Sequence, residues 1–195
     1  MNKVYEDCVV APSGFINAYM HSGEPEFVPM GDGSDPKQGY YKLPKASISK
    51  EMHVKNLIVS KASTLMAKRM LPGASWGDGI NYLELGTGVG SGTTQIPQAE
   101  VLGQVALRVP LARKAITSWT YLDINGNPIG SESNVLQFTT TFIETEAIGA
   151  IVEMGLSGGL ATVALGSGYM FNYKTFAVWN KDNTLKLTVV WKLTF

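Results

Sequence analysis

Few side chains in this 195-residue sequence have the type and spacing that catalysis or metal binding requires. His21 and His53 are the two histidines and Cys8 is the one cysteine, and none stands at a metal-ligand spacing from another. Serine-type hydrolysis needs a base beside the nucleophile, and nothing in the spacing pairs either histidine with a serine. The sequence therefore predicts neither a zinc site nor a catalytic serine.

A pair of carboxylates, Glu144 and Glu146, lies two residues apart. Two neighbouring acids are the chemistry of a glycosidase, in which one carboxyl donates a proton and the other attacks or activates water. Acids at the mouth of a hairpin are more often part of a solvated turn, and we favour that interpretation here.

A glycine-rich segment follows a short apolar run at Tyr82-Leu83-Glu84-Leu85-Gly86-Thr87-Gly88-Val89-Gly90. It resembles the first motif of methyltransferases that use S-adenosylmethionine, where an acidic residue and a glycine turn approach the cofactor before a helix begins. The following residues include Pro97, Gly103 and Pro110, which do not favour that helix. We therefore predict a glycine loop between two strands, with no enzymatic activity and no cofactor.

The charge and composition of the chain narrow the classes of partner. Sixteen basic residues balance sixteen acidic ones, so no overall field attracts nucleic acid or an anionic membrane. Only 16% of residues are charged and 45% are hydrophobic, which is typical of a subunit covered by neighbours and also fits a monomeric β-domain. The single cysteine favours folding in a reducing cytosol, and no segment predicts an export signal or a membrane span.

Residues 1–46 are predicted to form an extended N-terminal arm. They show no sustained helical or strand period and contain ten prolines and glycines. The arm is nevertheless rich in large apolar and aromatic side chains, which need a surface to lie on. It either wraps its own β-domain or, as we favour, reaches a neighbouring subunit. Its candidate interface residues are Phe15, Tyr19, Phe27, Tyr40 and Tyr41.

Residues 47–72 are predicted to contain one amphipathic helix, roughly Ser49 to Met70, packed on the β-domain. Apolar residues recur there at spacings of three and four: Val54, Leu57, Ile58, Ala62, Leu65, Met66 and Met70. Leu71-Pro72-Gly73 ends the segment because proline cannot continue a helix.

Residues 73–195 carry the two-residue period of half-buried strands. Leu136, Phe138, Thr140 and Phe142 alternate with more polar neighbours, and Leu185 to Phe195 alternates in the same way. Asn125-Gly126 is a strong hairpin-turn signal. Consecutive strands without intervening helices predict an antiparallel β-sandwich.

The segment from Asn56 to Phe195 resembles a group of small virion structural proteins of tailed bacteriophages. The resemblance lies in the order of short motifs: Ile80 to Gly88, Ala112-Arg113-Lys114-Ala115-Ile116, Phe138 to Phe142, Ile151-Val152-Glu153-Met154-Gly155-Leu156 and Leu187 to Phe195. It implies an immunoglobulin-like or related sandwich, many copies in each virion, no enzymatic activity and assembly in the host cytoplasm.

These observations leave three functions open. The first is a capsid decoration or cement protein that stabilises the shell through its arm, with the major capsid protein and copies of itself as partners. The second is a tail component, such as a fibre-attachment, collar or baseplate subunit. The third is a glycan- or receptor-binding module with Trp76, Trp119 or Trp179 as a stacking platform.

Overall fold

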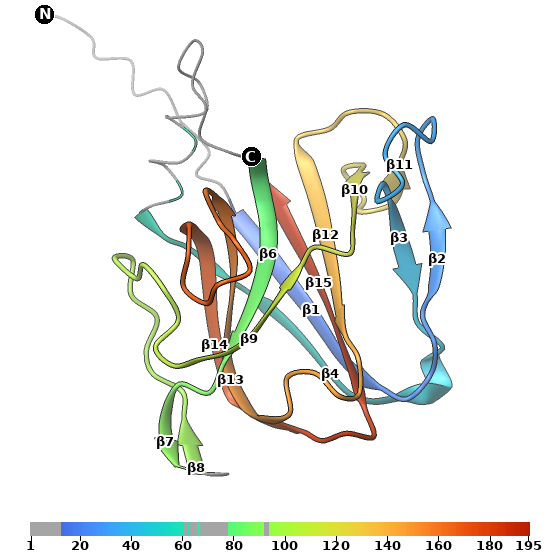
Figure 1. Cartoon of the computed structure of the whole chain (residues 1–195). Helices are drawn as coiled ribbons and strands as arrows, with labels where there is room; N and C mark the ends of the chain where they lie inside the picture. Colours follow the sequence, from blue (N-terminus) through green and yellow to red (C-terminus); the bar gives the residue numbers. More distant parts are fainter. Residues whose placement is uncertain (1–12, 61, 63–65, 67–77, 92–93) are drawn as a thin grey trace, which may run out of the picture.

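The computed structural model describes residues 13–60, 62, 66, 78–91 and 94–195. In this part the chain is mainly β, and its two antiparallel sheets pack face to face as a sandwich (Figure 1). The prediction of an antiparallel sandwich is confirmed at this level. No helix of the described residues is long and apolar enough to cross a membrane.

The larger sheet has six strands, in an order that brings both ends of the described chain to its middle. From edge to edge they are β11 (Pro128–Ile129), β10 (Ser118–Leu122), β12 (Val135–Phe142), β15 (Lys186–Thr194), β1 (Ser13–His21) and β4 (Ile48–Lys55). Strand β1 pairs with β15 over nine residues and with β4 on its other side.

The second sheet has five strands, and two short hairpins project from the sandwich. The sheet order is β5 (Leu57–Ile58), β14 (Tyr169–Lys181), β13 (Gly149–Gly159), β6 (Asp78–Gly86) and β9 (Pro110–Ala115). The hairpins are β2 (Glu26–Pro29) with β3 (Gly39–Lys42), and β7 (Val89–Ser91) with β8 (Thr94–Ile96). A single 3-10 turn, η1 (Lys45–Ser47), leads into β4.

The core lies between the two sheets and follows the alternation read from the sequence. Leu187, Val189, Trp191 and Leu193 of β15 are buried, and the paired strands β1 and β12 add inward-facing side chains beside them. Met154 and Leu156 of β13 belong to the same apolar cluster from the opposite sheet. Each buried aliphatic or aromatic side chain contributes roughly 1.5–3 kcal/mol, so this double layer is the main source of stability.

The turn predicted at Asn125-Gly126 is confirmed between β10 and β11. Asp123 Oδ1 accepts hydrogen bonds from the backbone N–H groups of Asn125 (2.9 Å) and Asn127 (2.7 Å). Gly126 has a φ of 86°, a left-handed conformation that glycine adopts without the strain of a side chain.

The predicted helix from Ser49 to Met70 is wrong in its first part. Residues 48–55 form strand β4 and residues 57–58 form β5, while most of residues 61–70 lie outside the described part of the chain. Met52 and Val54, which are two residues apart, both pack against the core. This is the two-residue alternation of a strand, and it replaces the helical spacing predicted for this segment. Ile58, which lies in β5, and Met66 both pack against the core, as was predicted for these two side chains.

The predicted N-terminal arm is also corrected. Residues 13–21 form β1 inside the six-stranded sheet, and residues 26–42 form the β2–β3 hairpin against β10, joined by an isolated bridge between Gln38 and Trp119. Residues 1–12 lie outside the described part. The physical reason is that Ile16, Ala18 and Met20 are fully or almost fully buried, so this segment completes the core of its own domain.

An alanine substitution at Ile16 tests whether β1 is a core strand. Ile16→Ala should lower the free energy of unfolding by about 2–5 kcal/mol in urea denaturation, because it leaves a cavity in the core. Phe15→Ala is the matched control: Phe15 is the next residue, faces outward and is 45% exposed, so the expected loss is below about 1 kcal/mol. Equal effects of the two variants would contradict the placement of β1.

Candidate functional site

The glycine-rich segment stands in an antiparallel setting. Strand β6, which leads to Gly86, pairs antiparallel with both β13 and β9, whereas the cofactor motif that it resembles needs parallel strands. Residues 82–86 of the segment belong to β6, and Val89 and Gly90 belong to β7. Thr87 and Gly88 connect the two strands, as predicted of a glycine loop, and Gly88 has a φ of 62°.

Glu153 is buried in β13 and holds a long loop in place. Its Oε1 accepts a hydrogen bond from the backbone N–H of Val109 (3.0 Å), and its Oε2 accepts one from the Tyr173 hydroxyl (3.0 Å). Burial and the neighbouring carboxylate raise the pKa of Tyr173 to about 12, so this hydroxyl remains a donor. The carboxylate thus connects β13, β14 and the end of the loop at residues 97–109.

Glu84 has the same role on the strand beside it. Its Oε1 accepts a hydrogen bond from the backbone N–H of Gly166 (2.8 Å), in the loop between β13 and β14. Arg113 donates hydrogen bonds to Ser167 Oγ (2.7 Å) and to the Ser167 carbonyl (2.8 Å) in that loop. Burial lowers the pKa of Arg113 and the carboxylate of Glu84 opposes that shift. Glu84 and Arg113 thus hold the loop between β13 and β14 at Gly166 and Ser167.

Glu144 and Glu146 are both ion-paired. Glu146 Oε2 lies 2.5 Å from Lys114 Nζ and accepts the backbone N–H of Ile143, and Glu144 lies 3.5 Å from Lys186. They lie at the turn after β12, as predicted, but each is paired with a lysine and not only solvated. Ser157 stands in a Gly-x-Ser-x-Gly spacing that the prediction from sequence missed, but it is buried inside β13 and is not on the exposed turn that this motif requires.

The two histidines lie in different environments. His21 is fully buried: its Nδ1 donates to the Gly23 carbonyl (2.9 Å) and its Nε2 accepts from the Thr188 hydroxyl (2.8 Å). Burial lowers its pKa, and the nearby Lys186 acts in the same direction. His53 is exposed, and its Nδ1 lies 2.8 Å from Asn17 Oδ1. No group of three potential metal ligands occurs in the part of the chain that the structure describes.

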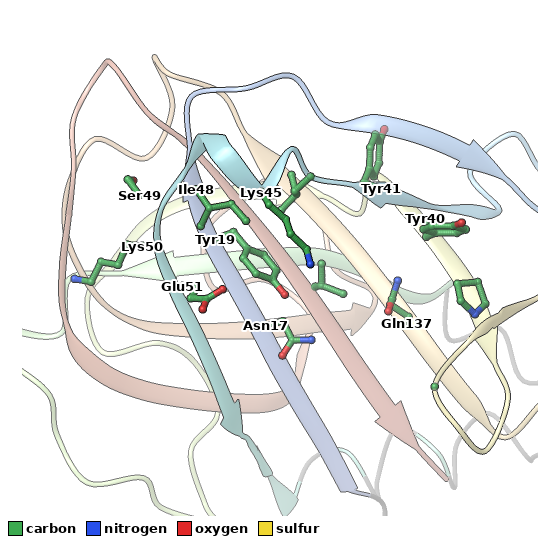
Figure 2. A pocket seen from close by; sticks show the side chains of 14 residues that line it. Asn17, Tyr19, Tyr40, Tyr41, Lys45, Ile48, Ser49, Lys50, Glu51 and Gln137 are labelled. Carbon is green, nitrogen blue, oxygen red and sulfur yellow. The ribbon is translucent and has the colours of Figure 1, made fainter.

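A hollow of about 870 Å³ lies on the outer face of the six-stranded sheet, between β1 and the segment from β3 to β4. Tyr19, Tyr40 and Tyr41 line it together with the amides of Asn17 and Gln137. We call it the tyrosine hollow. Figure 2 shows the two amides on the sheet below, Tyr40 beside β3, and Lys45 reaching down from η1. Burial raises the pKa of Tyr19, and the charge of Glu51 adds to this.

The five candidate interface residues share this side of the molecule. Tyr19, Tyr40 and Tyr41 line the hollow, and Phe27 packs on Tyr41 with ring centroids 5.1 Å apart. Phe15 lies farther along β1 on the same face, with Lys55 Nζ 5.6 Å from its ring centroid. The structure thus brings three of the five together, but on the domain's own surface rather than on a free arm.

A group of exposed apolar side chains lies in the β7–β8 hairpin and in the loop that leads to β9. It consists of Val89 and Ile96, paired across the β7–β8 hairpin, and Val101, Leu102, Val105 and Val109 from the loop before β9. We call it the apolar loop surface. These are six of the fourteen exposed large hydrophobic residues in the described part of the chain. In Figure 1 the hairpin and this loop project on the same side of the molecule.

The loop that carries this surface is fixed at several points. Glu100 lies 2.7 Å from Lys174 and accepts the backbone N–H of Thr175 (3.0 Å). Leu107 is buried against Val59, Met170 and Tyr173. The exposed apolar side chains are therefore held outward by an anchored backbone.

The tryptophans considered from the sequence as a stacking platform lie in different environments. Trp179 is buried, and Trp119 is half-buried with its Nε1 donating to Asp35 Oδ2 (2.9 Å). Trp76 lies outside the described residues. The aromatic residues that gather at a hollow are Tyr19, Tyr40 and Tyr41, which the fold brings together from two separate segments.

Comparison with known proteins identifies no relative. No family model matches the chain, and no curated protein and no solved structure matches it either.

Protonation of His21 should destabilise the domain. Its pKa in the folded state is below the ordinary value of about 6.5, so its contribution to stability is present above that pH and is lost as pH falls through the folded pKa. Lys186 faces the ring, while Glu24 and Glu144 oppose its effect. We expect the free energy of unfolding to fall less steeply in His21→Gln than in wild type between about pH 7.5 and 5.5. The exposed His53→Gln is the control and should keep the wild-type slope.

Removal of the Glu153 carboxylate should release the loop before β9. Glu153→Ala leaves the Tyr173 hydroxyl and the Val109 N–H without their acceptor, which costs about 1–3 kcal/mol of unfolding free energy. Hydrogen exchange of the Val109 amide should accelerate. Glu132→Ala, at an exposed glutamate, should change neither quantity; unchanged exchange in Glu153→Ala would show that the carboxylate does not anchor the loop.

Proposed function

We propose that this chain is a non-enzymatic structural subunit of a tailed-bacteriophage virion, most directly a capsid decoration or cement protein. The observation that supports it most is the apolar loop surface, because six large hydrophobic side chains are exposed on an anchored backbone. Exposed apolar patches of this kind mark contact surfaces between proteins. The order of motifs from Asn56 to Phe195 supports the virion assignment, and an immunoglobulin-like topology is part of the same proposal.

The energetics of this surface suit a subunit that is covered after assembly. Full burial of an exposed large apolar side chain contributes roughly 1.5–3 kcal/mol, and these six are already about half-covered, with exposed fractions of 45–60%. Their burial in a contact would therefore offset part of the lost translational and rotational freedom of association, about 4–15 kcal/mol. The anchored loop keeps the further cost of ordering small, because its backbone is already fixed by Glu100 and Glu153.

The contact surface differs from the one expected from the sequence. The sequence predicts that residues 1–46 contact a neighbouring subunit, but residues 13–21 are a strand of the domain's own sheet. The partners remain those expected: the major capsid protein or tail subunits, and copies of this chain, assembled in the host cytoplasm. In this proposal the chain meets them through residues 89–109.

The sheet edges favour contact through side chains over strand-to-strand pairing. β4 is an edge strand of eight residues, and Lys50, Glu51, His53 and Lys55 are exposed along it. Charged residues on an edge strand discourage uncontrolled pairing with another chain.

Copy number in purified particles tests the proposal. Band densitometry with labelled-antibody microscopy should find the chain on the capsid in hundreds of copies. A count of about three to a few dozen at the tail would instead identify a tail component. Absence of the chain from purified particles would contradict both.

Charged substitutions in the apolar loop surface should weaken attachment. Leu102→Asp and Val105→Asp place a carboxylate in the proposed contact, and each should raise the dissociation constant for particles that lack the chain at least tenfold, or about 1.4 kcal/mol. Sedimentation with such particles measures it. Ile124→Asp is the matched control, since Ile124 is 93% exposed on the β10–β11 turn, away from this surface. Equal binding by all three variants would contradict the surface assignment.

A further inference from the structure

The tyrosine hollow takes no part in the contact proposed above, and we propose that it is a binding site for a neutral glycan. It lies on the outer face of the six-stranded sheet, whereas the β8 end of the apolar loop surface contacts β13 and β14 of the other sheet. The inference does not rest on the virion assignment, since it follows from the side chains of the hollow alone.

Aromatic rings stand on two sides of the hollow. Tyr19 rises from β1 on the sheet and Tyr40 comes from β3, as Figure 2 shows. Both rings are half-buried, so part of each remains available to a ligand. The ring of Tyr19 is held by an edge-to-face contact with His53, with centroids 5.8 Å apart. The C–H face of a sugar can stack on a tyrosine ring. Because the Tyr19 ring is already held in place, such stacking costs little side-chain conformational entropy.

The floor offers neutral polar groups on either side of an apolar residue. Asn17 and Val190 are directly opposite each other on β1 and β15, and Gln137 lies on β12, the next strand. Asn17 is positioned by His53, whose Nδ1 lies 2.8 Å from Asn17 Oδ1, which leaves the Asn17 Nδ2 group to face a ligand. A planar amide both donates and accepts, which matches the hydroxyl groups of a sugar.

Several polar groups of the hollow have no protein partner. Among the described residues, none makes a hydrogen bond with the Gln137 amide or with the hydroxyls of Tyr19, Tyr40 and Tyr41. All four side chains are half-buried, so their polar groups remain accessible from the hollow. Polar groups that converge on a concave surface without protein partners are the usual means by which a site orients its ligand.

The charges at the hollow favour a neutral ligand over an anionic one. Lys45 and Glu51 are of opposite sign. The third charged group, Lys50, is turned away: its Nζ donates to the Val178 carbonyl (3.2 Å) and lies 4.9 Å from the ring centroid of Trp179. A phosphate site needs several cations or arginine forks aimed at one point, and the lining contains no arginine.

The dimensions fit a short oligosaccharide. A volume of about 870 Å³ is within the range of small-molecule sites, roughly 300–1,000 Å³. An extended peptide would instead pair with a free strand edge. The floor strands β1 and β15 are each paired on both sides, and the edge strand β4 carries the exposed charges of Lys50 and Glu51, which disfavour such pairing.

A glycan array tests the inference. The fluorescently labelled full-length chain should bind a subset of neutral oligosaccharides built from hexoses and N-acetylhexosamines, and titration calorimetry with the strongest array ligand gives its dissociation constant. Tyr40→Ala should weaken binding at least tenfold through the lost stacking surface, and Gln137→Ala about three- to tenfold through lost hydrogen bonds. Tyr40→Phe keeps the ring and should weaken binding less than Tyr40→Ala does.

The control is Gln98→Ala, which removes a half-buried amide in the loop before β9, outside the lining of the hollow, and should bind like wild type. Thermal unfolding of each variant shows that loss of binding is not loss of fold, because Tyr40 and Gln137 lie outside the core cluster. An array without neutral ligands, undiminished binding by Tyr40→Ala, or binding only to peptides would each overturn the inference. Copy number in purified particles is measured in a separate experiment. A failure of glycan binding therefore leaves the virion proposal untouched, and the reverse also holds.

Discussion

The pairing of β1 with β15 is the constraint on which the remaining structure depends. It joins residues 13–21 to residues 186–194 in an unbroken antiparallel register, so the centre of the larger sheet forms only when the two ends of the described chain meet. Ile16 then lies opposite Trp191, and both are fully buried against the second sheet. Contacts of such long sequence separation must overcome a large loop-closure entropy, and the buried apolar area of the two strands supplies the compensation.

The same alternation that buries one row of these strands presents the other row on the outer face. Asn17 and Tyr19 point outward because their neighbours along β1 point inward. In the same way, Val190 of β15 points outward because Trp191 points inward. The hairpin and η1 turn between β1 and β4 then close one side of the space above the sheet. The tyrosine hollow is therefore a consequence of the register, and its floor is as rigid as the core beneath it.

The sequence predicted the strands after residue 110 well, because their buried and exposed positions differ in polarity, as Phe138 and Gln137 do. It failed in β1, where the outward residues Phe15 and Tyr19 are also aromatic and conceal the two-residue period. It failed in β4 because Val54, Leu57 and Ile58 happen to fit a helical spacing, and tertiary pairing with β1 overrode that local signal. The hollow was not foreseeable, since Tyr19, Tyr40 and Gln137 are brought together only by the sheet order.

The two proposed surfaces are compatible because they belong to different sheets. The apolar loop surface is anchored to β13 and β14 through Glu153 and Glu100, and the tyrosine hollow rests on β1, β15 and β12. A neighbour that covers the loops at residues 89–109 therefore leaves the outer face of the six-stranded sheet open. Glu153 and Glu100 fix the loop that carries the first surface and strand register fixes the second, so neither needs a large rearrangement before it binds. The proposed contact through the loops of one sheet would therefore leave the other sheet open to solvent and small ligands.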